Sequence, residues 1–210
     1  MPELPEVQTT VDGLNHTVKG LKIIDVSTTY NSISHTQKDN IKNKKFFTYF
    51  KKKVIKQKII KVERRAKNIL IYLSSNDTIL VHMKMTGYFF YNPPKDTKYL
   101  RLIFTLNNGK KLGFSDLRKF AKVTLIKTST LSQSPHLKHL GPEPLDSAFT
   151  FSIFKKRLAI HPKMKIKTTL MDQSIIAGIG NIYSDEILWQ IGVRPDRKVE
   201  NLKDSDIKLM

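Results

Sequence analysis

Hydrophobic residues near the start of the chain recur at helical spacing. Separations of four, three and four residues place a set of apolar side chains on one face of an amphipathic helix: Val7, Val11, Leu14 and Val18. Pro5 suits the first turn of such a helix and Gly20 suits its end. The pattern therefore predicts a helix between Pro5 and Gly20.

Segments with the hydrophobic pattern of β-strands follow this helix. Their ranges are 21–30, 53–65, 69–73, 79–84, 99–106, 111–115 and 122–126. Asn108 followed by Gly109 is a strong signal for a hairpin turn, and residues 74–77 form a weaker one. Closely spaced strands with short turns predict an antiparallel sandwich or barrel.

The pattern changes near residue 130, where prolines and a glycine interrupt the chain: Pro135, Gly141, Pro142 and Pro144. Beyond them, apolar spacing predicts helices over 151–160, 170–176 and 183–191, and another helix that begins at Asp204. We therefore expect an α+β protein. Its parts are an N-terminal helix plus antiparallel β-sandwich domain (1–130), a hinge (131–148) and a helical domain (149–210).

The chain carries 37 Lys and Arg residues against 18 Asp and Glu, a formal net charge of +19. Such a charge attracts polyanions, and nucleic acid is the commonest soluble polyanion. A coding bias toward lysine, or attraction to a membrane surface, would also account for this charge. No apolar run is long enough to cross a bilayer, and Glu3 and Glu6 stand where a signal peptide would be basic. We therefore expect a cytoplasmic, nucleoid-associated protein.

The sequence offers no metal site. It has no cysteine, which excludes disulfides and cysteine-ligated metals within these residues. Its histidines are His16, His35, His82, His136, His139 and His161. None of them pairs with an acidic residue at ligand spacing, so we interpret all six as structural.

The N-terminal string Met-Pro-Glu-Leu-Pro-Glu-Val can carry covalent chemistry. Removal of Met1, normal before proline, leaves Pro2 with a free secondary amine. An α-amine has a pKa of roughly 7.7–8.0, so part of it is neutral near pH 7. A neutral amine can attack a sugar C1′ atom and form an iminium ion that accepts electrons. The alternative is that proline and glutamate serve only to cap the helix.

This string resembles the N-terminus of formamidopyrimidine-DNA glycosylases, without interruption from Pro2 onward. The resemblance implies that Pro2 is the Schiff-base nucleophile, that Glu3 donates a proton to the opening sugar, and that Glu6 holds the active-site network. The segment Val-Glu-Arg-Arg-Ala-Lys resembles a basic family segment that ends in a catalytic lysine, which is Lys67 here. On composition alone, Lys67 is one solvated charge among many.

Two further segments resemble the family's void-filling residues. An enzyme acting on a damaged base must extrude the nucleotide, at a cost of about a few kcal/mol. Within residues 82–87 and 116–120, Met85 and Phe120 correspond to side chains that enter the duplex, and Arg118 to one that hydrogen-bonds the orphaned partner base. Without the resemblance, Met85 and Phe120 are ordinary core residues.

Residues 173–197 resemble the helix–two-turn–helix motif of the same superfamily. Glycines before a helix allow backbone N–H groups to approach a phosphate, and Asn181 can add a side-chain donor. The resemblance also implies DNA contacts by Tyr183, Lys163 and Lys167. Taken alone, a Gly-x-Gly stretch is more typical of a plain turn.

The chain departs from the family pattern at several positions. Lys84 and Ala121 stand where glycine is usual, and Tyr99 lies where some relatives have a DNA-contacting histidine. The family ends in a four-cysteine zinc finger, which would lie beyond Met210. We therefore expect no cofactor in this chain and a protein that continues past Met210, although a variant without the finger is the alternative.

These resemblances imply a bifunctional DNA glycosylase and AP lyase. We expect it to act as a monomer on damaged double-stranded DNA and to excise oxidised purines such as 8-oxoguanine and formamidopyrimidines. Leu4 disfavours the branch that prefers oxidised pyrimidines, which usually has glycine at that position. A DNA-binding fragment without catalysis and a basic RNA-associated protein both stay open as alternatives.

Overall fold

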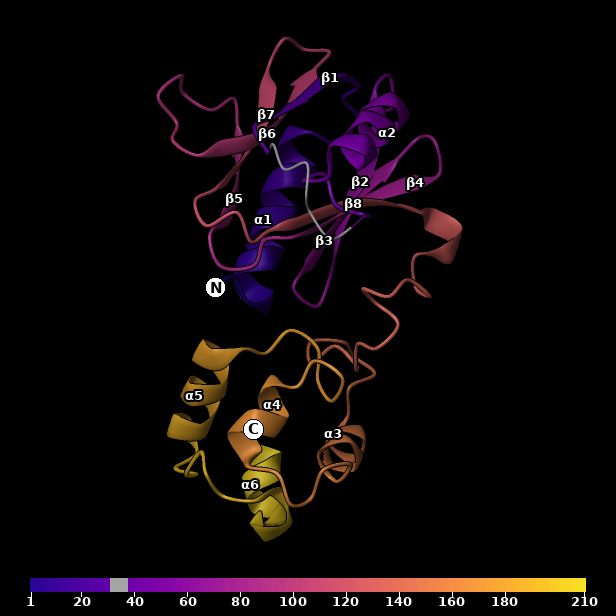
Figure 1. The fold of residues 1–210 in the computed structure, drawn as a ribbon. Helices are drawn as coiled ribbons and strands as arrows, with labels where there is room; N and C mark the ends of the chain where they lie inside the picture. Colours follow the sequence, from indigo (N-terminus) through magenta and orange to yellow (C-terminus); the bar gives the residue numbers. More distant parts are fainter. Residues whose placement is uncertain (31–37) are drawn as a thin grey trace. The chain divides into compact units, whose positions relative to one another are not determined.

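The computed structural model describes residues 1–30 and 38–210, which divide into two compact units, Met1–Ser134 and Pro135–Met210 (Figure 1). His35 lies outside the described residues. Each unit has its own hydrophobic core. Among the helices of the described ranges, none is long and apolar enough to cross a membrane.

The first unit is built on two four-stranded antiparallel sheets. One has the order β1-β6-β7-β5, formed by Ile23–Thr28, Leu100–Leu106, Lys111–Asp116 and Gly87–Tyr91. The other has the order β2-β3-β4-β8, formed by Ile59–Arg65, Asn68–Leu73, Asp77–His82 and Lys122–Lys127. Apolar side chains of both sheets share one core, so the predicted antiparallel sandwich is confirmed.

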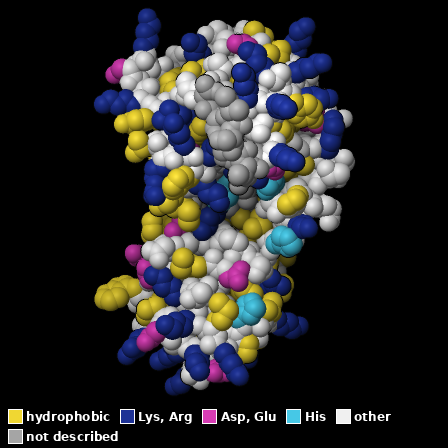
Figure 2. Space-filling model, in the orientation of Figure 1, with side chains coloured by type: hydrophobic (Ala, Val, Ile, Leu, Met, Phe, Trp, Pro, Cys, Tyr) yellow, Lys and Arg dark blue, Asp and Glu magenta, His cyan; other side chains and the backbone are white. Residues whose placement is uncertain are grey.

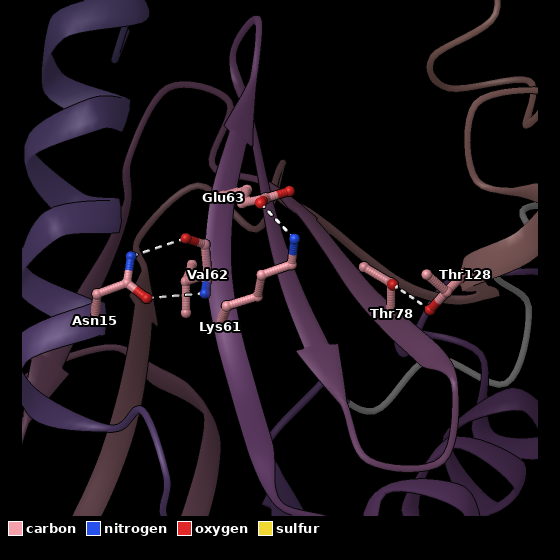
Figure 3. Close-up of polar contacts among 6 residues, drawn as sticks. All are labelled: Asn15, Lys61, Val62, Glu63, Thr78 and Thr128. Carbon is pink, nitrogen blue, oxygen red and sulfur yellow. Dashed lines mark hydrogen bonds and ion pairs between the residues drawn. The ribbon is translucent and has the colours of Figure 1, made fainter.

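The helix α1 (Leu4–Thr17) packs against the edge strand β2. It buries the apolar face that the sequence predicts: Val7, Val11 and Leu14, with Leu4. The side chain of Asn15 pairs with the backbone of Val62, donating from Nδ2 at 2.8 Å and accepting at Oδ1 at 2.9 Å (Figure 3). An amide side chain thus satisfies backbone groups that an edge strand leaves open.

The helix α2 (Lys44–Val54) is not among the predicted elements, and the predicted strand 53–65 wrongly includes its end. The many lysines of this segment obscure a helical repeat. Apolar residues four apart face the core: Phe46, Phe50 and Val54. Asn43 caps the helix, because its Oδ1 accepts from the backbone N–H of Phe46 at 3.1 Å.

The strand β5 is also missing from the prediction. It starts at Gly87, where a Cβ atom would lie 2.6 Å from the carbonyl oxygen of Met83, so the sequence needs glycine for this close approach. Both predicted hairpin turns are confirmed. Gly109 has a φ of +79° between β6 and β7, and Asn76 has a φ of +57° between β3 and β4.

The second unit is helical, as the sequence predicts. Its helices are α3 (Phe151–Leu158), α4 (Ile166–Met171), α5 (Asn181–Gln190) and α6 (Asp204–Leu209); short 3₁₀ turns lie at Val199–Asn201 here and at Thr128–Thr130 in the first unit. The helix predicted over 170–176 is wrong in position, since α4 ends at Met171. Asp172 stops it by accepting from the backbone N–H and the Oγ of Ser174 at 2.8 and 2.7 Å.

Candidate active site

The start of α1 holds the predicted nucleophile and proton donor. Pro2 and Glu3 are both buried, and Glu3 is 1% exposed. Glu3 forms a capping box with Glu6, whose Oε2 accepts from the Glu3 backbone N–H at 2.8 Å. Capping and chemistry do not exclude each other here, because the capping box fixes the backbone to which Pro2 is joined.

Side-chain contacts align α1 antiparallel to β2. The Oε1 of Gln8 accepts from the Nε of Arg64 at 2.9 Å, in addition to the amide pairing farther along the helix (Figure 3). Arg64 also donates through Nη1 to the carbonyl of Ala66 at 3.2 Å. The alignment directs the start of α1 toward the turn that follows β2, where Lys67 lies.

Lys67 lies in the turn between β2 and β3 and is only 6% exposed. Ala66 before it has a φ of +52°, which bends the backbone sharply. Burial lowers the pKa of the Lys67 ammonium, the Glu3 carboxylate acts in the opposite direction, and Lys84 lowers it further. Glu3 and Lys84 therefore both act electrostatically on Lys67, and we call these three residues the charge cluster; its member Glu3 directly follows Pro2 in the chain.

The charge cluster predicts a pH effect. If Lys67 contacts a phosphate as an ammonium, activity is lost as the pH rises through its lowered pKa. Lys84→Gln removes a positive neighbour, raises the pKa of Lys67, and is expected to move the alkaline limb of strand cleavage to higher pH. The measurement is a pH profile at saturating lesion DNA. Lys84→Arg keeps the positive charge and should leave the alkaline limb of the pH profile where it is in the unmodified protein. The same alkaline limb in Lys84→Gln and Lys84→Arg would contradict an electrostatic effect of Lys84 on Lys67.

His82 has the structural role that the sequence analysis expects of it. It ends β4, opposite Asn68, which directly follows Lys67. Its Nδ1 accepts from the backbone N–H of Lys84 at 3.1 Å. This imidazole therefore supports the segment that carries Lys84, which has a φ of +56°. That conformation favours glycine, the residue that the family resemblance leads us to expect at this position.

The three predicted void-filling residues lie together. Met85 and Phe120 are 45% and 51% exposed, which is not the behaviour of core residues. The Sδ of Met85 accepts from Nη1 of Arg118 at 3.0 Å, and the Arg118 guanidinium lies 4.6 Å from the centroid of the Phe120 ring. We call Met85, Arg118 and Phe120 the probing triad. The loop that follows β4 and the loop that follows β7 thus place these three exposed side chains next to one another.

Tyr99 lies near the base of these loops. It is 48% exposed, has a φ of +59°, and its ring lies 5.8 Å from the Arg101 guanidinium. Its carbonyl accepts from the backbone N–H of Asp116, which immediately precedes the second loop of the probing triad. The structure therefore brings this predicted DNA contact next to the triad. Figure 2 shows Lys and Arg side chains dispersed over the visible face of the first unit, with hydrophobic side chains between them.

In the second unit, a glycine-containing loop leads into α5. Gly178 has a φ of +100°, and the amide of Gln173 holds the loop by accepting from Gly178 N–H at 2.9 Å and donating to the Ile179 carbonyl at 2.7 Å. Gly180 is the N-cap of α5, and Asn181, its first residue, is exposed. The loop thus presents Asn181 and the backbone N–H groups of a helix start.

The remaining predicted contacts of this unit differ in exposure. Lys163 is exposed, whereas Tyr183 is partly buried against the core of the unit. Lys167 forms an ion pair with Asp185 at 2.7 Å, and its side chain is 27% exposed. A phosphate would therefore have to compete with, or share, the partner of Lys167.

Comparisons with known proteins extend over both units. The family model described as "Formamidopyrimidine-DNA glycosylase N-terminal domain" matches residues 1–123, and the one described as "Formamidopyrimidine-DNA glycosylase H2TH domain" matches residues 140–210. A curated Ligilactobacillus salivarius protein named Formamidopyrimidine-DNA glycosylase is 35% identical over 212 aligned residues, which span 100% of this chain and 73% of that protein.

Comparisons with solved structures agree with the sequence comparisons. The Lactococcus lactis Fpg in complex with DNA containing an abasic site has a TM-score of 0.86 and 30% identity, over 99% of this chain and 73% of that chain. MutM in complex with DNA containing carbocyclic 8-oxo-G also has a TM-score of 0.86 and 30% identity, over 99% of this chain and 76% of that chain. The similarity includes the segments that carry the candidate site.

Proposed function

The chain belongs to the formamidopyrimidine-DNA glycosylase family, and we propose that it excises oxidised purines from duplex DNA through a Schiff base on Pro2. Family membership makes it a DNA glycosylase of base excision repair with AP lyase activity. The observation that supports the Schiff-base proposal is the burial of Glu3 and Lys67, which interact electrostatically, with Glu3 directly following Pro2 in the chain. We expect the protein to be associated with chromosomal DNA, which contains its substrate.

The reaction that these residues support has two stages. The neutral secondary amine of Pro2 forms a bond to C1′ as the bond from C1′ to the damaged base breaks and the base leaves with its electron pair. The Glu3 carboxylate accepts the N–H proton that the newly formed Pro2 ammonium releases and passes it to the ring oxygen O4′; the sugar opens, and an iminium ion joins C1′ to Pro2. The iminium acidifies the C2′ proton, so its removal expels the 3′-phosphate, and a second elimination expels the 5′-phosphate.

The other charges of the cluster fit this chemistry. Lys67 as an ammonium can neutralise a phosphate next to the lesion, and its burial strengthens that attraction.

The probing triad has side chains that can stabilise the duplex after the damaged base is extruded. Met85 and Phe120 can fill the vacated stack, and Arg118 can donate hydrogen bonds to the unpaired partner base.

The second unit is proposed to bind the phosphate backbone. Asn181→Ala removes an exposed side-chain donor at the start of α5 and is expected to weaken binding to lesion and undamaged duplex alike, by about fivefold to tenfold. Fluorescence anisotropy measures the dissociation constants for a lesion duplex and an undamaged duplex of the same sequence. Gln190→Ala at the exposed end of the same helix is the control. A loss confined to lesion DNA would contradict a backbone contact.

A panel of damaged duplexes tests the proposed function. It contains 8-oxoguanine, a formamidopyrimidine, an oxidised pyrimidine and an abasic site, each treated with borohydride during the reaction. We expect covalent trapping and strand cleavage with the purine lesions, with a one-nucleotide gap as the product. Preferential action on the oxidised pyrimidine would assign the chain to the other branch, and binding without trapping on any lesion would make it a non-catalytic DNA-binding protein.

A further inference from the structure

A buried carboxylate lies behind the exposed probing triad. Asp116, the last residue of β7, is 0% exposed. Its Oδ2 accepts from the hydroxyl of Tyr30 at 2.8 Å and from the backbone N–H of Ala121 at 2.9 Å, and its Oδ1 accepts from the Oγ1 of Thr86 at 2.8 Å. A buried charge is costly unless it is hydrogen-bonded, and these donors come from separate parts of the chain.

The hydrogen bonds of Asp116 tie together the two loops that carry the triad. Thr86 directly follows Met85, and its hydroxyl donates to Asp116 while accepting from the backbone N–H of Arg118 at 3.1 Å. Ala121, at the far end of the second loop, donates to the same carboxylate. The first loop and both ends of the second are therefore fixed to one side chain.

A buried lysine also holds the second loop. Lys42 is 8% exposed and donates from Nζ to the carbonyl of Lys119, in the middle of the second loop. Burial lowers the pKa of Lys42, and Asp116 opposes that effect. Burial, followed by Asp116, raises the pKa of Tyr30, so its hydroxyl keeps the proton that it donates.

We infer that Asp116 is a positioning residue that acts through Thr86 to hold the probing triad as one unit, so that filling the void and reading the opposite base depend on each other. The inference rests on the proposed function, because it assigns a purpose to the triad. The reaction proposed for the sugar uses none of the groups in this network. The network should therefore affect base extrusion and opposite-base discrimination, and leave the covalent chemistry of Pro2 intact.

The test compares two substitutions of Thr86. Thr86→Val keeps the shape and removes the hydroxyl, whereas Thr86→Ser keeps the hydroxyl. We expect Thr86→Val to slow excision of 8-oxoguanine opposite cytosine by about tenfold, and to change the ratio of the excision rates opposite cytosine and opposite adenine, the opposite-base preference, by a similar factor. Cleavage of an abasic site in single-stranded DNA, which needs no void filling, should change less than about twofold, since the lost interaction is not used there. Thr86→Ser should restore both values.

Thr78→Val is the matched control. Thr78 is buried in the same unit and its hydroxyl bonds Thr128 at 2.8 Å, away from Asp116 (Figure 3). It should leave the opposite-base preference unchanged. Equal losses on the duplex and single-stranded substrates in Thr86→Val, or an unchanged preference, would overturn the inference. Borohydride trapping of the unmodified protein on the abasic strand reports the proposed function separately, so the two can fail independently.

Discussion

A form of the protein that keeps one residue in front of Pro2 is expected to give no borohydride-trapped complex with lesion DNA. A secondary amine becomes an amide nitrogen when it is acylated, and an amide neither attacks C1′ nor forms an iminium ion. Strand cleavage should fall by at least about a thousandfold, the scale seen when a nucleophile is removed. The measurement is trapping on an 8-oxoguanine duplex with Met1 fully retained or fully removed.

DNA binding provides the control for this experiment. Anisotropy with undamaged duplex should agree within about twofold between the two forms, because nonspecific affinity depends on phosphate contacts throughout the protein. A blocked form that binds normally and is not trapped isolates the amine as the missing group. A blocked form that is trapped as efficiently as the free one would show that another amine reacts.

Glu3→Gln is expected to have the second-largest effect. Glutamine has nearly the same shape and can still cap α1, but it cannot donate a proton to O4′. Loss of a positioned general acid lowers rates by about 10²–10⁴-fold, and we expect that range for 8-oxoguanine release in single turnover. A preformed abasic site exists partly as the open aldehyde, so its cleavage should suffer less. Similar losses on both substrates would argue against proton donation to the ring oxygen.

The environment of Glu3 makes this prediction specific. The side chain is 1% exposed and contributes electrostatically to Lys67, whereas Glu63 on β2 is paired with Lys61 at 2.6 Å on the surface. Glu63→Gln is therefore the matched control and should leave the rate unchanged (Figure 3). Circular dichroism with thermal melting should show that Glu3→Gln keeps its fold, since the capping contact of Glu6 remains.

Local patterns in the sequence were enough to predict the sandwich, its hairpins and the first helix. Val7, Val11 and Leu14 follow the helical repeat without interference, and they are the residues that α1 buries. The helix α2 was not predicted, because five of its eleven residues are lysines that flank its apolar residues on both sides. The helix predicted over 170–176 was misplaced because a local turn at Asp172 outcompetes it.

The candidate site could be predicted in part. The family resemblance identified Met85 and Phe120 as exposed DNA-contacting residues, whereas hydrophobicity alone would place both side chains in the core. The structure leaves them 45% and 51% exposed. The network around Asp116 could not be predicted, because its donors lie at Tyr30, Thr86 and Ala121 and meet only in the folded unit. Long-range side-chain hydrogen bonds leave no periodic pattern in a sequence.

Peptide mapping of the borohydride-trapped complex tests the central claim most directly. The trapped protein is digested, and mass spectrometry locates the residue that carries the reduced deoxyribose fragment. We expect the adduct on the nitrogen of Pro2, in a peptide that begins at Pro2. An adduct on Lys67, or on any chain that still carries Met1, would contradict the claim that the proline amine is the nucleophile.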